Sequence, residues 1–178
     1  LATRPIIDAD LSESEWEGAS ELDPLASDWD GRPSDQRVRI LTGVFRDSAY
    51  VAVQVNRAPS ANTIADTEQA FVRDGRVEFS FAAPPYHGKS GTLTTLALNA
   101  LGLTPETAAI SCRTATRATQ SWWRAEMAIA VQEVASFSRF NVALVEPEGD
   151  EVRTTWSVTY GAPQDATRFG DITWEEGN

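Results

Sequence analysis

The sequence predicts an all-β fold, an antiparallel β-sandwich with one or two short helices. Apolar and polar residues alternate at a period of two in many short runs, and turn-forming residues separate these runs. Apolar residues make up 42% of the 178 residues and are spread along the whole chain, which is enough to fill a core. About eight or nine short strands with few helices favour a sandwich. We expect residues 1–178 to form one domain.

A β-hairpin is predicted near the start of the strand-rich region. Arg37 to Ile40 alternates polar and apolar side chains, Arg46 to Ser48 has turn chemistry, and Tyr50 to Val55 places its valines on one face. The same alternation predicts later strands at Val77/Phe79/Phe81, Thr92 to Asn99, Trp123/Ala125/Met127/Ile129, Phe140/Val142/Leu144, Thr154/Trp156/Val158 and Ile172/Trp174.

Two segments carry helix signals. Ser12 to Glu15 fits a capping box, with a serine N-cap and a glutamate three residues later, which predicts a short helix that carries Trp16. The run from Thr104 to Gln120 is ambiguous, because its small residues permit a helix while its threonines favour a strand.

The net charge is −11, with 26 acidic and 15 basic residues, which argues against nucleic acid or an anionic membrane surface as a partner. No apolar stretch approaches the ~20 residues that span a bilayer. A neutral ligand or a bound cation suits this charge better. The acidic clusters Asp28–Asp30 and Glu146–Glu151 suggest either calcium ligands or solvated loops, and neither has the spacing of an EF-hand.

Catalytic signatures are missing. His87 is the only histidine and lies in a turn-like segment, so a nucleophilic triad would have to use it. Cys112 is the only cysteine, which excludes an internal disulfide and a Cys/His zinc site. There is neither a Gly-x-Ser-x-Gly elbow nor a phosphate-binding loop. With 26 acids, some pair would reach glycosidase spacing by chance. We therefore predict that the chain is not an enzyme.

Motifs along nearly the whole chain are similar to those of family 9 carbohydrate-binding modules. They stand in family order and comprise Arg4 to Leu11 with Glu15-Trp16, the Val38 to Val55 hairpin, Asp74-Gly75-Arg76-Val77-Glu78-Phe79, Asn99-Ala100-Leu101-Gly102, Trp123 to Ile129, Arg139-Phe140-Asn141-Val142, Thr155-Trp156-Ser157 and Arg168-Phe169-Gly170-Asp171-Ile172. The resemblance implies an antiparallel sandwich that binds oligo- or polysaccharide without catalysis. It also implies an exported protein, extracellular, at the cell surface or periplasmic.

The resemblance further implies a sugar site with two clamping aromatic rings and a glutamate. Phe71 stands near the first clamp position, and Tyr160 is the aromatic residue closest to the second. Glu78 matches the glutamate, and strand alternation turns it away from Val77 and Phe79, toward solvent or a groove.

Two tryptophans are further stacking candidates. Trp29 lies in a polar loop, and alternation makes Trp122 the outward partner of the pair Trp122-Trp123. Trp16, Trp156 and Trp174 fall in fold motifs and are expected in the core.

Two other functions stay open. The same sandwich could serve as a structural or interaction domain, which would show a large apolar patch in place of exposed rings. Related sandwiches carry haem, for which His87, Met127 and Lys89 are the available axial ligands. Because the chain starts at Leu1, we expect a mature or excised part of a larger exported protein.

Overall fold

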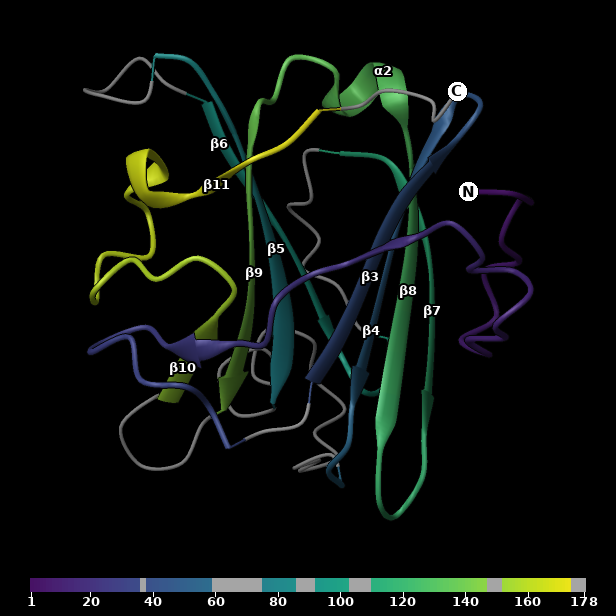
Figure 1. The fold of residues 1–178 in the computed structure, drawn as a ribbon, viewed down its shortest axis with the longest axis horizontal. Helices are drawn as coiled ribbons and strands as arrows, with labels where there is room; N and C mark the ends of the chain where they lie inside the picture. The colour runs from purple at the N-terminus through teal and green to yellow at the C-terminus, as the bar shows by residue number, and fades with distance from the viewer. Residues whose placement is uncertain (36–37, 59–74, 86–91, 103–109, 147–151, 174–178) are drawn as a thin grey trace.

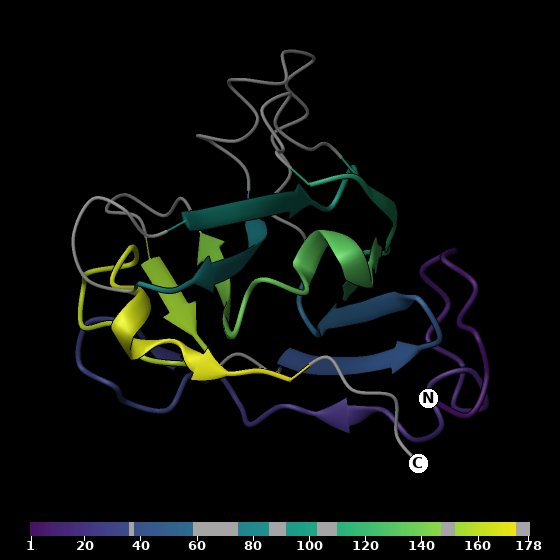
Figure 2. The same ribbon diagram turned by 90° about the horizontal axis from the view of Figure 1, so that it is seen from above.

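The structure is a computed structural model, and it describes residues 1–35, 38–58, 75–85, 92–102, 110–146 and 152–173. Its strands form two antiparallel sheets that face each other, as predicted (Figures 1 and 2). Sheet A has the order β1-β3-β4-β8-β7, and sheet B the order β2-β10-β9-β5-β6, with β11 also paired to β9. The strands are β1 (Ser20–Glu21), β2 (Ala26–Ser27), β3 (Val38–Phe45), β4 (Ser48–Val55), β5 (Arg76–Ala83), β6 (Thr92–Asn99), β7 (Cys112–Ala118), β8 (Trp123–Ala130), β9 (Arg139–Glu146), β10 (Val152–Thr155) and β11 (Gly170–Asp171).

The core lies between the sheets and follows the period-two pattern of the sequence. Val77, Phe79 and Phe81 of β5 are fully buried, and they belong to one apolar cluster with Val53 of β4 and Met127 of β8. Burial of a side chain of this size contributes about 1.5–3 kcal/mol. The predicted hairpin is confirmed as β3 and β4, which pair along their full lengths.

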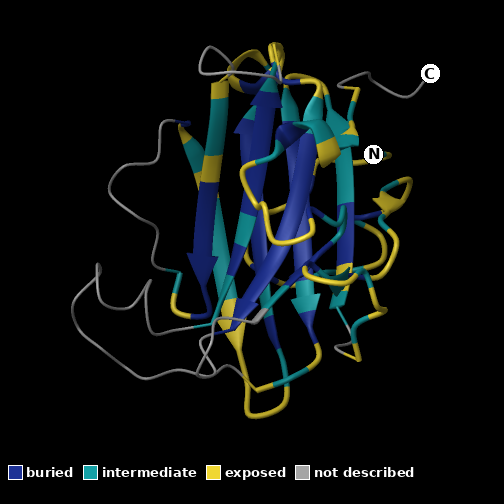
Figure 3. Ribbon diagram, turned by 90° about the vertical axis from the view of Figure 1, so that its left-hand side faces the viewer, coloured by how far each residue is buried: buried dark blue, intermediate teal, exposed yellow. Residues whose placement is uncertain are grey.

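Terminal segments cover part of each outer face. The N-terminal segment lies beside sheet A, where Leu1, Ile7 and Trp16 pack on Tyr50 of β4 (Figure 1). On sheet B, Phe169 packs with Ala166 of the 3₁₀ helix η1 (Ala166–Arg168) against Ala82. Figure 3 shows that the middles of the strands are the most buried part of the molecule.

The helix predicted from Ser12 does not form, and this prediction is wrong. The Ser12 hydroxyl does donate to the Glu15 carboxylate, but the backbone closes only one turn, with Glu15 N–H and Trp16 N–H both donating to the Ser12 carbonyl. The helices that the described residues contain are α2 (Val131–Val134) and η1. Neither is long and apolar enough to cross a membrane.

The ambiguous run from Thr104 to Gln120 contains β7, so its threonines indicated the structure correctly there. Residues 103–109 lie outside the described part. Strand β10 ends at Thr155, earlier than predicted, although Trp156 N–H still donates to the Val142 carbonyl of β9. Trp174 also falls outside the described residues.

Glu126 of β8 is a fully buried acid on the outer side of sheet A. Its Oε2 accepts from Asp8 N–H at 2.9 Å and Ala9 N–H at 2.7 Å, while Oε1 accepts from the Trp16 indole at 3.2 Å. Burial raises the pKa of the Glu126 carboxyl, and these three donors partly oppose that effect. The side chain therefore ties two parts of the N-terminal segment to β8.

Glu126→Gln is expected to destabilise the fold and to flatten part of its pH dependence. Glutamine offers one acceptor oxygen in place of two, so a buried N–H loses its partner, at a cost of about 1–3 kcal/mol. Because folding raises the pKa above its ordinary value of 4.5, the stabilisation by Glu126 is full below that value and declines as pH rises through the folded pKa. The stability difference between the two proteins should thus widen as pH falls from 7 toward 4.5.

Urea unfolding of both proteins at several pH values measures this difference. A constant difference across that range would contradict the assigned direction of the pKa shift.

Candidate functional site

The outer face of sheet B carries an acid between two small residues. Glu78 of β5 points away from the core, as strand alternation predicted, and its pairing partners on the neighbouring strands are Ala97 of β6 and Ala143 of β9. The two alanine side chains are too short to cover a neighbouring carboxylate. Both alanines are themselves buried, at 6% and 5% exposure, and the Glu78 side chain is 12% exposed, so other side chains cover most of this position.

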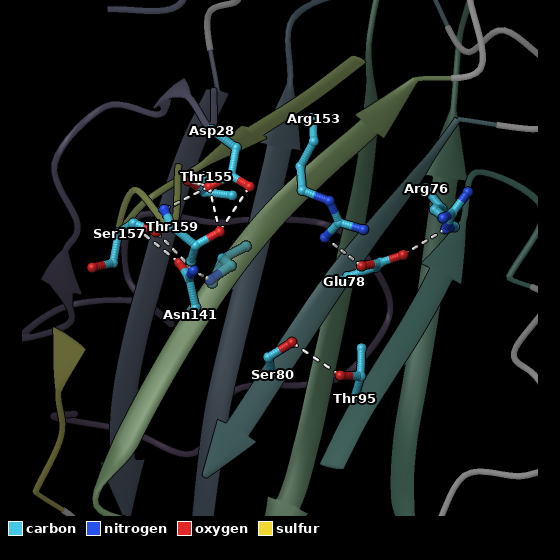
Figure 4. Close-up of polar contacts among 11 residues, drawn as sticks. Asp28, Arg76, Glu78, Ser80, Thr95, Asn141, Arg153, Thr155, Ser157 and Thr159 are labelled. Atoms are coloured by element: carbon cyan, nitrogen blue, oxygen red, sulfur yellow. Dashed lines mark hydrogen bonds and ion pairs between the residues drawn. The ribbon is translucent and has the colours of Figure 1, made fainter. Parts of the chain in front are cut away.

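Two arginines hold the Glu78 carboxylate in place. Arg76 Nε lies 2.7 Å from Oε1, and Arg153 Nη1 of β10 lies 2.7 Å from Oε2 (Figure 4). The three side chains are 12–18% exposed, so the pairs are partly shielded from water. Among the described residues, each Glu78 oxygen accepts only one hydrogen bond, and a carboxylate oxygen has capacity for a second.

Farther along the same face, uncharged polar side chains pair across the strands. The hydroxyls of Ser80 and Thr95 lie 3.0 Å apart. The amide of Asn141 donates to the Ser157 carbonyl at 2.8 Å, and its oxygen accepts from Ser157 N–H at 2.9 Å (Figure 4). The Asn141 side chain thereby holds the segment after β10 against β9, because it bonds both backbone groups of Ser157, as a paired strand would.

Asp28, which follows β2, is the buried acid of this region, with 3% exposure. Its Oδ1 accepts from Thr159 N–H at 2.6 Å and from the Thr155 hydroxyl at 3.2 Å, and the Thr159 hydroxyl lies 2.8 Å from both carboxylate oxygens (Figure 4). In the backbone, Gly161 N–H donates to the Asp28 carbonyl at 3.0 Å. The loop after β2 and the segment after β10 are therefore fixed to one another.

Two exposed aromatic rings lie on these joined segments. Trp29 is 79% exposed and Tyr160 is 58% exposed. A Cβ atom on Gly161 would stand 2.9 Å from the six-membered ring of Trp29, and one on Gly31 would stand 3.8 Å from the Tyr160 hydroxyl. Each ring thus lies beside the glycine of the other segment. The guanidinium of Arg168 lies 5.1 Å from the centre of the Tyr160 ring.

Arg153 connects the charged and the aromatic parts of this surface. Its guanidinium pairs with Glu78, while its carbonyl accepts from Asp28 N–H at 3.1 Å, one residue before Trp29. We call the Arg76–Glu78–Arg153 cluster together with Trp29 and Tyr160 the sheet B site.

Solved structures of other proteins share this architecture. No family profile matches the sequence, and no curated protein matches it. Two structures of a family 9 carbohydrate-binding module (CBM9) from Caldicellulosiruptor kristjanssonii, one in complex with cellotriose and one with glucose, match 98% of this chain. The TM-scores are 0.69 and 0.72 at 13% identity, covering 91% and 93% of those chains. The fold is of the CBM9 type.

A third match is a protein from Bacteroides uniformis, provisionally described as carbohydrate-binding. It has a TM-score of 0.60 and 15% identity, and the match covers 96% of this chain and 94% of that one. All three identities are low, so the likeness concerns the fold.

The CBM9-type fold brings three of the five predicted site residues to sheet B, namely Glu78, Trp29 and Tyr160. Phe71 lies outside the described residues. Trp122 lies directly before β8 of sheet A, where Arg124 sits 4.5 Å from the centre of its ring. Trp123 beside it is buried, so alternation identified the outward member of the pair correctly.

In the part of the chain that the structure describes, no group of acidic side chains is arranged to hold a calcium ion. Asp28 faces inward to its two threonines, and Asp30 pairs with Arg32 at 3.2 Å. Glu146 pairs with Arg57, and residues 147–151 lie outside the described part. For haem, Met127 is fully buried between the sheets, while His87 and Lys89 are outside the described residues.

Sequence reasoning overlooked three contributors to the sheet B site. Arg76 was visible, since it stands two residues before Glu78 and so on the same face of the strand. Arg153 was not, because its contact depends on β10 being separated from β5 by β9 alone. Asp28 was predicted only as part of an acidic cluster, either calcium ligands or a solvated loop, and its inward direction has no signal in the sequence.

Asp28→Ala is expected to lower the free energy of unfolding by about 1.5–3 kcal/mol, because it leaves a buried N–H and two hydroxyls without their charged acceptor. It should also increase the mobility of the Trp29 indole. Urea unfolding and Trp fluorescence anisotropy measure the two effects. Asp30→Ala, two residues away in the same loop, is the matched control; it removes only an exposed pair with Arg32 and should lower the unfolding midpoint much less than Asp28→Ala does. Equal effects of both variants would contradict the role of Asp28.

Proposed function

We propose that residues 1–178 form a non-catalytic module that binds carbohydrate at the sheet B site. The observation that carries the proposal is the Glu78 carboxylate, held between Arg76 and Arg153 on an outer face where the cross-strand neighbours are alanines. The CBM9-type fold supports it, since two structures of that fold contain glucose or cellotriose.

The chemistry of the charged cluster suits sugar hydroxyls. A carboxylate oxygen that already accepts one hydrogen bond can accept another from a hydroxyl, and a guanidinium donates in a fixed planar fork. Vicinal hydroxyls present a donor and an acceptor side by side, so an acid–arginine pair can engage both. The paired charges also keep their geometry without a ligand, which lowers the entropic cost of binding.

The aromatic rings supply the complementary apolar contact. A pyranose exposes a face of C–H groups that packs on a π-surface, and Trp29 offers the more exposed ring of the two. Tyr160 already carries Arg168 near its ring, so we assign it the smaller stacking role. Phe71, outside the described residues, stays a predicted contributor from the family resemblance.

An interaction domain without sugar binding is the second candidate, and no observation favours it. It predicted a large apolar patch, whereas two of the four exposed large hydrophobic residues in the described part are the sheet B rings. By the same family resemblance, we propose that the module belongs to an exported protein at or outside the cell surface.

Glu78→Gln is expected to weaken sugar binding about tenfold or more, because a charge-assisted hydrogen bond contributes about 1.5–3 kcal/mol. Isothermal calorimetry with glucose, cellobiose, cellotriose and a panel of soluble polysaccharides measures it, with thermal melting as a fold check. Glu21→Gln is the matched control, since Glu21 is also paired with an arginine but lies on sheet A. Absence of binding by the unmodified protein to the whole panel, or equal binding by Glu78→Gln, would refute the proposal.

Trp29→Ala should weaken the same binding two- to tenfold, corresponding to about 0.5–1.5 kcal/mol for a lost stacking contact. Trp122→Ala removes a tryptophan from sheet A and should bind as the unmodified protein does. The calorimetric titration measures both affinities, and the reverse pattern would move the stacking surface to the other sheet.

A further inference from the structure

A depression on the outer face of sheet A lies opposite the sheet B site. It is a cavity of about 220 Å³, lined by Arg4, Ser48, Ser111, Cys112, Arg113 and the β8 residues 128–130. One water occupies roughly 30 Å³ of the liquid, so the space accommodates a small ion with part of its hydration shell.

Strand register explains why a depression forms here. Ala128 and Ala130 on β8, the strand between β4 and β7, form its floor, because their methyl groups leave the sheet surface low. Ala128 pairs with Tyr50 on one side and with Arg113 of β7 on the other. The longer side chains of Tyr50 on β4 and Arg113 on β7 therefore stand on either side of the short alanine side chains of β8.

A guanidinium stands on each side of this floor. On the β4 side, Arg4 Nε donates to the Tyr50 hydroxyl at 3.2 Å, which fixes the end of its side chain over the sheet. On the β7 side, Arg113 is exposed, and no residue in the described part pairs with it. The flanking strands β4 and β7 are two strand spacings apart, about 10 Å, so long side chains from the two sides can meet over one ion.

The remaining groups at the rim agree with an anionic ligand. The hydroxyl of Ser111 is a neutral donor at this rim, while the Ser48 hydroxyl already donates to Asp47 Oδ1 at 3.1 Å. Asp47 is the nearby countercharge, since it interacts electrostatically with Arg4. Burial raises the pKa of the Cys112 thiol, so this group adds no negative charge at neutral pH. Two cations thus face Asp47 and, two residues before Ala128 on the same face of β8, Glu126, and both acids are already hydrogen-bonded.

We propose that this depression binds an oxyanion, held between the guanidinium groups of Arg4 and Arg113. The shared chemistry is a sulfate, phosphate or carboxylate group with two or more oxygens, for which the planar guanidinium fork is well suited. The group can come from a free inorganic ion or from an acidic sugar. The proposal does not depend on sugar binding at sheet B, because it concerns the other face and a charged ligand.

The chain offers a matched control for Arg113. Arg117 lies four residues later on β7, is likewise exposed, and points to the same face, but at about 13 Å along the strand it does not line the cavity. Arg113→Gln and Arg117→Gln change the net charge equally. Any difference between them reports the local site and not the overall field of the protein.

The experiment follows amide shifts by NMR while sodium sulfate, sodium phosphate, sodium glucuronate or neutral glucose is added at constant ionic strength. We expect saturable shifts at Ser111, Ala128 and Ala130. The apparent affinity should fall at least fivefold in Arg113→Gln and stay within twofold in Arg117→Gln. Arg4→Gln should also weaken binding, with thermal melting to confirm that the loss of the Tyr50 contact leaves the fold intact.

Saturation by sulfate or phosphate would establish a site for free inorganic anions, while saturation by glucuronate alone would assign it to an acidic sugar. The proposal is overturned by shifts that never saturate, by equal effects of the two β7 variants, or by glucose acting as the anions do. Failure of glucose to bind at the sheet B site would leave this result unaffected.

Discussion

A buried carboxylate on each side of the sandwich fixes a segment of chain that the strands alone would leave loose. A carboxylate removed from water needs several donors in a fixed geometry, since an unpaired buried charge is costly. Glu126 meets this requirement with two backbone N–H groups and the indole of Trp16. Asp28 meets it with the Thr155 and Thr159 hydroxyls and one backbone N–H. Both acids therefore hold irregular backbone segments in fixed positions, as pairing between strands does within a sheet.

The sheet B site depends on the second of these networks. Asp28 is bonded through its side chain to Thr159 and through its backbone to both Gly161 and Arg153. Trp29 follows it directly and Tyr160 precedes Gly161, so the same bonds position the rings. The site thus combines a rigid charged cluster on strands with aromatic rings on loops that are tied to those strands. For the ligand we propose, such an arrangement would limit the entropic cost of ordering the site on binding.

Much of the fold was predictable because alternation reports which face of a strand is buried. The motifs of the family resemblance also have local physical causes here. In the Phe169-Gly170 pair, a Cβ on Gly170 would overlap the ring of Trp156, and Asn141 bonds the backbone of Ser157 on both sides. Each of these contacts requires one particular residue type at one position, so it is visible as a short motif in the sequence.

The failed helix at Ser12 shows where local reasoning ends. Ser12 and Glu15 bond to each other only through their side chains, which caps no backbone N–H, and the indole of Trp16 donates to Glu126, which is 110 residues away in the chain. A contact of that range outweighs the weak preference of a few residues for helix. Arg153 was overlooked for the same reason, because its partner Glu78 is 75 residues distant. The direction of Glu78 was predictable from its own strand, and its partners required the sheet order.

The two outer faces differ in how closely their arginines are paired with acids, and for this reason we propose different ligands for them. On sheet B, Arg76 and Arg153 both lie 2.7 Å from the Glu78 carboxylate, so these three side chains carry one net positive charge in a fixed and partly shielded geometry. On sheet A, Arg113 and Arg117 are exposed on β7, and Arg117 faces Arg124 of β8 directly across the sheet. Salt at physiological strength screens exposed charges beyond about 8 Å, which weakens attraction between an anion and sheet A. The proposed hydrogen bonding of a neutral sugar to the paired cluster on sheet B would lack that long-range component, so the salt dependence of binding would distinguish the two proposed sites.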